Sequence, residues 1–189
     1  MTRRWPVPAL ALTAAVVLST AVVLLWMGRE PICKCGYVKL WHGVTYSSEN
    51  SQHIADWYTP SHLIHGLLFF AAAWLALRWL APGWRLLAAT VVECVWEIAE
   101  NTDAVIERYR EVTISLDYYG DSVLNSVADI GAMVLGFWLA GRLPVWVSVA
   151  IAIGFEILTI AVIRDGLALN VLMLLWPLDA VRAWQAGGL

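Results

Sequence analysis

Residues 6–27 read PVPALALTAAVVLSTAVVLLWM, an apolar run without one charged side chain. A helix that crosses the hydrocarbon core of a bilayer needs about 20 such residues, so this run predicts a membrane-spanning helix. Five further segments meet this length or come close, and prolines or glycines lie near most of the joins between them. They are residues 60–80, 85–106, 122–141, 144–163 and 167–184. The sequence therefore predicts an all-α fold, a six-helix transmembrane bundle that forms one integral-membrane domain over residues 1–189.

The composition of the chain also indicates a membrane protein. Hydrophobic residues make up 60% of the 189 positions and charged residues 14%, whereas a soluble domain is closer to half apolar and a quarter charged. The three cysteines are too few for a disulfide scaffold. The formal net charge of −3 leaves no basic face and argues against a nucleic-acid partner. We therefore expect membrane lipids to surround this chain.

The basic residues predict the direction in which the chain crosses the membrane. Arg3 and Arg4 precede the first apolar run, which is longer than the roughly 7–15 apolar residues of a signal peptide and has no A-x-A cleavage site after it. We therefore expect a retained first helix. Lys and Arg divide equally between the two sides, but the segments on the side of the N-terminus are shorter and more densely basic. Because basic segments favour the cytoplasm, the N-terminus and the C-terminus of a six-span chain are both expected there.

Polar side chains recur at helical spacing in three of the predicted spans. Lipid cannot solvate such a face, so each set should point into the bundle. The alternating direction of the helices brings the sets to the outer half of the membrane, where Glu156 and Asn170 also fall. The sets are His62 and His65, then Glu93, Glu97 and Glu100, then Asp121, Asn125 and Asp129. This convergence predicts one polar pocket; the alternative is hydrogen bonds that only hold helices together.

The two histidines suggest a metal centre. His62 and His65 with a carboxylate from Glu97 would form a set of ligands that leaves a position open for water, as in many hydrolytic zinc sites. Zinc, iron or manganese would suit these ligands. The alternative is a hydrogen-bonded histidine pair that holds the second span against the third. The candidates for catalytic acid or base are Glu97, Glu100, Asp121 and Asp129.

Four residues outside the apolar spans are candidates for substrate contact. His53 and Asp56 belong to the first outer loop, which would fold over the pocket as a lid. Arg108 and Arg164 lie at the outer surface and would grip an anionic head group. Each has a plainer alternative. The first two would be ordinary polar loop residues, Arg108 would belong to a helix end with its own ion pairs, and Arg164 would pair with Asp165.

Cys33 and Cys35 lie in the same outer loop. Cysteines at this separation would close a strained ring, so we expect them not to pair with each other. A soft-metal site or a transient redox pair is the alternative. Cys94, in the third span, is expected to be a small residue of the core.

Several short motifs run through the chain: Gly28-Arg29-Glu30, Ser51-Gln52-His53, Tyr58-Thr59-Pro60-Ser61-His62 with His65, Trp96-Glu97-Ile98 with Glu100-Asn101, Arg108-Tyr109-Arg110, Asp117-Tyr118-Tyr119-Gly120-Asp121-Ser122 with Asn125-Ser126, and Arg164-Asp165. They resemble a family of proteobacterial inner-membrane proteins that is described only as a domain of unknown function. The resemblance covers the chain nearly end to end. It implies a multi-pass protein of the cell inner membrane and brings no activity with it.

A looser resemblance is to VanZ-like membrane proteins. Those proteins place a His on one helix, a Glu on the next, and then Asp and Asn before a Gly-rich helix. The matching residues here are His65, Glu97, Asp121, Asn125 and Gly136. The pattern is sparse, so it implies a similar placement of polar residues and no particular function.

The leading interpretation is a metal-dependent hydrolase or transferase that opens to the outer face and acts on a lipid or a lipid-linked substrate. One alternative is a proton- or cation-coupled membrane carrier, in which the acidic groups from Asp121 to Glu93 form a path. The inner halves of the spans are almost bare of polar groups, which argues against a path across the membrane. A second alternative is a non-catalytic membrane assembly factor whose polar core only specifies helix pairing.

Overall fold

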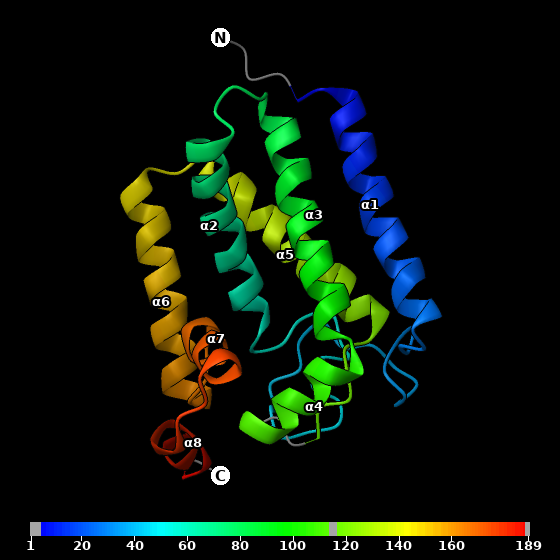
Figure 1. The fold of residues 1–189 in the computed structure, drawn as a ribbon, viewed down its shortest axis with the longest axis vertical. Coiled ribbons are helices and arrows are strands. Elements are labelled where there is room, and N and C mark those ends of the chain that lie inside the picture. The colour runs from blue at the N-terminus through cyan, green and yellow to red at the C-terminus, as the bar shows by residue number, and fades with distance from the viewer. Residues whose placement is uncertain (1–4, 114–116, 188–189) are drawn as a thin grey trace.

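The computed structural model describes residues 5–113 and 117–187 and shows eight helices in them (Figure 1). In chain order these are α1 (Val7–Trp26), α2 (Thr59–Ala76), α3 (Pro82–Glu100), α4 (Asp103–Val112), α5 (Val123–Ala140), α6 (Val145–Ile163), α7 (Leu167–Leu175) and α8 (Asp179–Ala186). In these ranges the only pairing of extended backbone is a single bridge between His42 and Asp56. The predicted all-α fold is confirmed.

Five long helices build the bundle, with α5 crossing behind α2 and α3 in the view of Figure 1. They are α1, α2, α3, α5 and α6, and each has 18 to 20 residues. At 1.5 Å per residue this length is about the thickness of the hydrocarbon core of a bilayer. α1, α2, α5 and α6 are also apolar enough to cross a membrane. α3 is as long, but it carries Arg85 and three glutamates.

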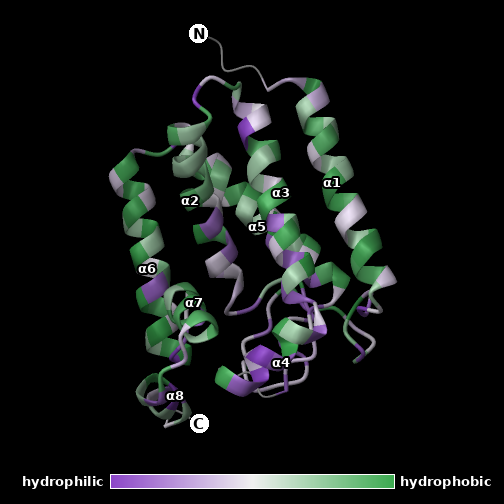
Figure 2. Cartoon of the chain, in the orientation of Figure 1, coloured by the Kyte–Doolittle hydropathy of each residue, from purple (hydrophilic) through white to green (hydrophobic). Residues whose placement is uncertain are grey.

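The long helices consist mainly of apolar residues (Figure 2), and many of their large apolar side chains are exposed. Of the most apolar stretch of 18 residues in α6 only 11% is buried, and of the corresponding stretch in α1 only 22%. Leu18, Trp26 and Val145 are among the most exposed apolar side chains. A continuous apolar surface of this kind marks an interaction with other molecules, and acyl chains would solvate it. The exposed apolar surface is therefore compatible with a protein embedded in a membrane.

α2 and α5 approach each other in backbone contact at Gly66. A Cβ built on Gly66 would lie 2.0 Å from the carbonyl oxygen of Met133, so a larger residue does not fit there. Small residues permit such close approach of helices in membranes. The contact holds the first half of α2 beside Asp129 of α5, and both contribute to the candidate site described below.

The sixth span expected over residues 167–184 is not formed. The chain instead makes two short helices, α7 with nine residues and α8 with eight. Pro177 lacks a backbone N–H and disfavours helical conformation in the residue before it. Trp176 accordingly leaves the helix with φ −145° and ψ 80°. The expected six-helix bundle is therefore a bundle of five long helices with three short ones.

Because of this break, the C-terminal helix α8 lies at a different end of the bundle from the one expected. α7 and α8 lie beside the end of α6 that is far from the start of α1 (Figure 1). The start of α1 and the end of α8 are thus at opposite ends of the bundle, contrary to the expectation that both termini share one side. Arg3 and Arg4, which supported the predicted orientation, lie outside the described residues.

The third span, expected over residues 85–106, also ends early. α3 stops at Glu100, and Asn101 and Thr102 separate it from α4. α4 and the long loop (residues 27–58) gather at the same end of the bundle, next to the end of α3 and the start of α5 (Figure 1). This end carries most of the polar residues of the molecule (Figure 2).

Candidate functional site

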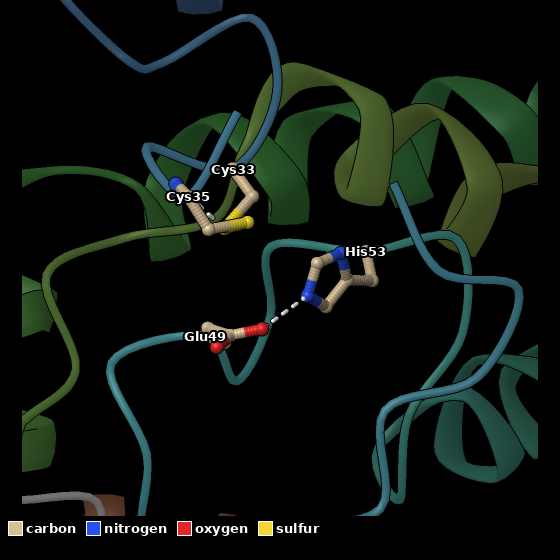
Figure 3. Close-up of side chains that lie close together, drawn as sticks. All are labelled: Cys33, Cys35, Glu49 and His53. Carbon is tan, nitrogen blue, oxygen red and sulfur yellow. Dashed lines mark hydrogen bonds and ion pairs between the residues drawn. A yellow bond between two sulfur atoms is a disulfide. The ribbon is translucent and has the colours of Figure 1, made fainter. Parts of the chain in front are cut away.

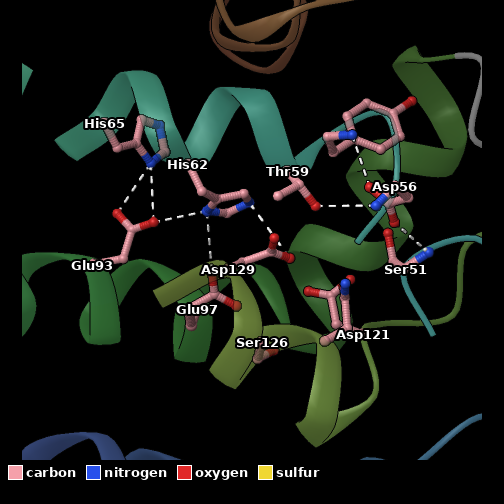
Figure 4. A network of polar contacts seen from close by, with 12 residues as sticks. Ser51, Asp56, Thr59, His62, His65, Glu93, Glu97, Asp121, Ser126 and Asp129 are labelled. Atoms are coloured by element: carbon pink, nitrogen blue, oxygen red, sulfur yellow. Dashed lines mark hydrogen bonds and ion pairs between the residues drawn. The ribbon is translucent and has the colours of Figure 1, made fainter. Parts of the chain in front are cut away.

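The first turns of α2 and the last turns of α3 bring imidazoles and a carboxylate together (Figure 4). His62 and His65 are three residues apart and share one face of α2. Nδ1 of His62 donates a hydrogen bond to Oε1 of Glu93 at 2.7 Å, and Nδ1 of His65 donates to Oε2 at 3.0 Å. Glu93 is fully buried. Both imidazoles are therefore oriented by a single carboxylate of α3.

His62 also faces two further carboxylates (Figure 4). Its Nδ1 lies 3.4 Å from Oε1 of Glu97, and its Nε2 lies 3.9 Å from Oδ2 of Asp129 on α5. Both oxygens of Glu97 and Oδ1 of Asp129 are buried without a hydrogen-bond partner among the described residues. A buried carboxylate in this condition is costly as an anion. The cluster therefore requires protons or a cation to compensate its charge.

Two groups of side chains in this cluster could hold a metal ion, and they share His62. The ligand atoms of His62, His65 and Glu93 lie within 4.8 Å of one another, as do those of His62, Glu97 and Glu100. Neighbouring ligands of a tetrahedral zinc ion lie about 3.3 Å apart, given metal–ligand distances near 2.0 Å. Small side-chain movements would therefore produce a ligand set. The carboxylate that contacts both imidazoles is that of Glu93. The sequence analysis favoured Glu97 as the metal ligand from this helix.

A cavity of about 240 Å³ lies beside the cluster. Its polar wall includes His62, His65, Glu100, Asp121, Asn125 and Asp129. Its apolar wall includes Phe69, Val92, Trp96, Val171 and Leu174. Val92 of α3 and Val171 of α7 are 53% and 44% exposed respectively. The apolar wall thus includes solvent-accessible side chains of α3 and α7.

Asp121 lies at the start of α5 and has partners on both oxygens. Asn101 Nδ2 donates to Oδ2 at 3.0 Å, and the Tyr118 hydroxyl donates to Oδ1 at 3.1 Å. Burial raises the pKa of Asp121 to about 6, although the hydrogen bond from Asn101 lowers it. The cap of α5 is its neighbour Ser122, whose hydroxyl accepts the N–H of Asn125 at 3.1 Å. Asp121 ties the end of α3 to the start of α5 and also lines the cavity.

Asp56 organises the turn that leads into α2. Its two oxygens accept the backbone N–H groups of Ser51 at 2.9 Å and of Tyr58 at 2.8 Å. Burial raises the pKa of Asp56, and these backbone hydrogen bonds oppose the rise. Asp56 is not among the residues that line the cavity as described. The structure therefore gives this residue a local role in the long loop.

His53 belongs to a different cluster in the long loop. Its Nδ1 accepts the backbone N–H of Lys39 at 3.2 Å, and its Nε2 donates to Glu49 at 3.0 Å. Glu49 also accepts the ammonium of Lys39 at 2.6 Å. These hydrogen bonds from Lys39 and His53 lower the pKa of Glu49 to about 2. The imidazole of His53 is fully buried there and is not among the residues of the cavity walls.

The two arginines expected to hold a head group bind helix ends instead. Arg108 donates from Nε and Nη2 to the carbonyl oxygen of Leu174, near the end of α7, at 3.3 and 3.2 Å. Arg164 donates from Nη1 to the carbonyl oxygen of Trp184, in α8, at 2.8 Å. A cation near the C-terminus of a helix is stabilising. The structure does not bring either guanidinium into the cavity walls.

Glu156 and Asp165 anchor the start of α7. Glu156 accepts the N–H groups of Leu167 at 2.8 Å and of Ala168 at 3.2 Å, so it caps the helix and lies outside the polar cluster. Asp165 accepts the Tyr58 hydroxyl at 3.2 Å. Burial raises the pKa of Asp165 to about 6. Gly166 and Asn170 are nearby partners of Asp165. Sequence reasoning missed the contact with Tyr58 because that residue lies 107 positions away in the chain.

Comparison with known proteins shows where the chain belongs. A family model described as "Protein of unknown function (DUF2585)" matches residues 24–187. The chain belongs to this family. The match contains the whole cluster around His62, and the family resemblance seen in the motifs is confirmed. No solved structure shows a significant match.

Members of the UPF0314 group are closely similar to this DUF2585 chain. The UPF0314 protein of Paracoccus denitrificans is 74% identical over 174 residues, which cover 92% of this chain and 90% of that protein. A UPF0314 protein of Sinorhizobium fredii is 60% identical over 183 residues, covering 97% and 91%. That of Novosphingobium aromaticivorans is 57% identical over 176 residues, covering 90% and 89%.

The long loop of this DUF2585 member contains a disulfide between Cys33 and Cys35 (Figure 3), so the expectation that they do not pair is wrong. The N–H of Gly36 donates to the carbonyl oxygen of Cys33 at 3.1 Å, and Gly36 has φ +82°. The chain therefore turns at the pair and brings the two Cα atoms to 5.1 Å, a usual distance for a disulfide. Glu49 and His53 lie beside the sulfurs (Figure 3).

Proposed function

We propose that this DUF2585 protein is a membrane enzyme that uses a divalent metal ion to hydrolyse, or to transfer, a group of a lipid substrate. The observation that carries this proposal is the buried cluster in which His62, His65 and Glu93 converge beside Glu97, whose oxygens have no hydrogen-bond partner among the described residues. Zinc, iron and manganese all accept imidazole and carboxylate ligands, so the donor atoms fit each of them.

A metal ion bound in this cluster would compensate the negative charge of its buried carboxylates. It would replace the ring protons that His62 and His65 donate to Glu93, so its binding would weaken as the pH falls. It would also offset the negative charge of Glu97, which lies 3.4 Å from His62. The ion would lower the pKa of a bound water and supply the nucleophile.

Asp129 is the best-placed general base. It lines the cavity, faces His62 from the side opposite Glu93, and has a buried oxygen without a hydrogen-bond partner among the described residues. At this position its carboxylate would accept a proton from the attacking water. Glu100 lines the same wall and would return a proton to the leaving group. Asp121, whose oxygens are both engaged, would hold the wall in place.

The cavity walls favour a lipid with an uncharged reacting group. The apolar wall of Phe69, Trp96 and Leu174 suits an acyl chain, and the exposed valines of α3 and α7 in the same wall would let lipid enter the cavity from the side. Of the described residues that line the cavity, none is Lys or Arg. An ester or amide carbonyl fits this wall better than a phosphate, whose negative charge would be repelled by the carboxylates of Glu100, Asp121 and Asp129.

The basic residues support a location in the inner membrane with the cavity towards the outer face. Arg78 lies in the turn between α2 and α3, Arg85 lies in the first turn of α3, and Arg142 lies between α5 and α6. These turns are at the same end of the bundle as the start of α1 (Figure 1). Basic residues in short turns favour the cytoplasmic side, so these arginines support a cytoplasmic location for this end. With five long helices, α8 would then lie on the outer side.

A non-catalytic role in membrane assembly is the second candidate. The hydrogen bonds from His62 and His65 to Glu93 join α2 to α3 even without a metal ion. A proton- or cation-coupled carrier has less support, because a path would have to continue past residues 66–76 of α2 and 130–140 of α5. Both of these stretches are apolar.

Elemental analysis of the full chain, purified in detergent without chelators, tests the metal centre. We expect about one zinc, iron or manganese ion per chain in the wild type. Glu93→Gln and His62→Ala should lower this content at least tenfold, whereas the exposed control Asp103→Asn should retain it. Wild-type protein that is free of metal, and that does not bind added metal, would overturn the proposal in favour of the assembly role.

A further inference from the structure

We propose that Cys33 and Cys35 form a thiol–disulfide exchange site that a dithiol reduces, separate from the cluster around His62. The two sulfurs are bonded in the long loop, beside Glu49 and His53 (Figure 3). Four features of this loop support exchange chemistry: the small size of the ring, the unequal access to the two sulfurs, a donor for the leaving thiolate, and the hydrogen bonding of His53.

The disulfide does little to hold the fold. Only Lys34 separates the two cysteines, and the entropy that a cross-link removes from the unfolded chain grows with the length of the loop it closes. The adjacent backbone is fastened by other means. The carbonyl oxygens of Glu30 and Pro31 accept the N–H groups of Val123 at 2.8 Å and Leu124 at 3.2 Å. Opening the disulfide therefore leaves the loop attached to α5.

Access to the two sulfurs is unequal. Cys33 is 3% exposed, whereas Cys35 is half-buried between exposed neighbours. An incoming thiolate therefore reaches the sulfur of Cys35 more easily and displaces that of Cys33. The backbone N–H of Cys35 donates to the sulfur of Cys33 at 3.2 Å. This donor stabilises the negative charge that appears on Cys33 when it leaves.

The hydrogen bonding of His53 disfavours metal binding at these sulfurs. Because its Nδ1 accepts the N–H of Lys39, its proton is on Nε2, the nitrogen that faces Glu49. A metal ion at Nε2 would have to remove this proton and would compete with Lys39 for Glu49. Glu49 instead places a fixed negative charge within 4.8 Å of the sulfurs, which slows the approach of an anionic thiolate.

The exchange takes place in two steps. A thiolate of the dithiol attacks the sulfur of Cys35, the bond between Cys33 and Cys35 breaks, and the electron pair stays on Cys33, which takes a proton from water. In the mixed disulfide, the first sulfur of the dithiol is bonded to Cys35. The second thiolate of the dithiol then attacks this first sulfur and releases the thiolate of Cys35, which takes a proton from water. The protein gains two electrons and two protons, and the dithiol loses the same number to become a cyclic disulfide.

Reduction by dithiothreitol of the full chain in detergent, followed by a maleimide that adds mass to each thiol, tests this proposal. The buried Cys94 is replaced by Ala so that only the pair is counted. We expect both thiols to appear together while the melting temperature stays unchanged, and oxidised dithiothreitol to close the bond again. A disulfide that opens only when the protein unfolds, or thiols that never pair, would overturn the proposal.

Two pairs of variants test its details. Glu49→Gln should accelerate reduction about fourfold, the factor expected for removing a unit charge about 5 Å away in water, while the exposed control Glu107→Gln should not.

With oxidised glutathione, Cys33→Ser, which retains Cys35, should form a mixed disulfide at least tenfold faster than Cys35→Ser. Equal rates within both pairs would contradict the unequal access and the role of Glu49.

Discussion

Gly136 of α5 lies directly against the main chain of Leu63 of α2: a Cβ built on Gly136 would come within 2.1 Å of the Leu63 carbonyl oxygen. Leu63 follows His62, so the contact that joins the two helices also sets the height of the imidazole relative to Asp129. The geometry of the candidate site therefore depends on a glycine that has no chemical role in it.

Gly136→Ala should destabilise the protein by about 1–3 kcal/mol, because the added methyl group forces α2 and α5 apart. The matched control is Gly131→Ala in the same helix, where a Cβ would meet no atom within 4 Å. Thermal unfolding in detergent compares the two variants. Equal melting temperatures would show that the helices are not in backbone contact.

Glu156→Gln should loosen α7 without affecting the cluster around His62. The carboxylate accepts the N–H groups of Leu167 and Ala168, and loss of a charged cap costs about 1 kcal/mol. Hydrogen exchange should become about fivefold faster at the first amides of α7 and stay unchanged in α2. Unchanged exchange in α7 would contradict the capping role and return Glu156 to the list of candidate site residues.

Asp165→Asn should change how stability depends on pH. In the folded protein Asp165 keeps its proton up to about pH 6, against an ordinary pKa of 3.8. The stability that this proton contributes is complete below about pH 4 and is lost as the pH rises through 6. The shift corresponds to at most about 3 kcal/mol.

The asparagine variant carries no such proton, so its melting temperature should fall less than that of the wild type between about pH 4 and pH 7. Part of the fall should persist, since burial also raises the pKa of Asp121 to about 6. The exposed control Asp103→Asn should follow the wild-type curve. Parallel curves for wild type and Asp165→Asn would show that Asp165 is not buried as described.

Arg108→Ala separates a structural role from contact with a substrate. The guanidinium holds the carbonyl oxygen of Leu174, so its removal should cost about 1 kcal/mol and speed hydrogen exchange in α7. The metal content should equal that of the wild type. A variant with normal exchange in α7 but weakened binding of a lipid would instead support the head-group role that the sequence suggested.

The sequence predicts well those features that belong to one helix at a time. Apolar runs marked α1, α2, α5 and α6 because a helix in contact with lipid needs an unbroken apolar surface. Spacing placed His62 and His65 on one face because that depends only on helical geometry. Which carboxylate meets these histidines depends on two helices and on where each begins and ends.

The choice between Glu93 and Glu97 shows this dependence. The expected span continued to residue 106, whereas α3 ends at Glu100. Counting 1.5 Å per residue, His65 lies about 9 Å from the start of α2 and Glu93 about 10 Å from the end of α3, so they meet at one level. If α3 ended at residue 106, Glu93 would lie too deep to reach the histidines. Glu97 and Glu100, which are nearer that end, therefore looked better placed to contact them.

Contacts at helix ends account for three other differences, and at Pro177 the sequence indicates a bend where the structure has a break. Pro177 divides the expected last span, and this creates the end of α7 and the start of α8. Helix ends carry unsatisfied N–H and C=O groups that attract charged side chains. Glu156, Arg108 and Arg164 bind at such ends. Hydropathy does not register a break between two apolar stretches, so these partners could not be predicted.

The most direct test of the metal centre is the X-ray absorption spectrum of the metal bound to the purified wild-type protein. Coordination by His62, His65 and Glu93 predicts only nitrogen and oxygen neighbours, with the scattering pattern of about two imidazoles, and its loss in Glu93→Gln. A shell of sulfur neighbours would place the ion at Cys33 and Cys35 and contradict the account.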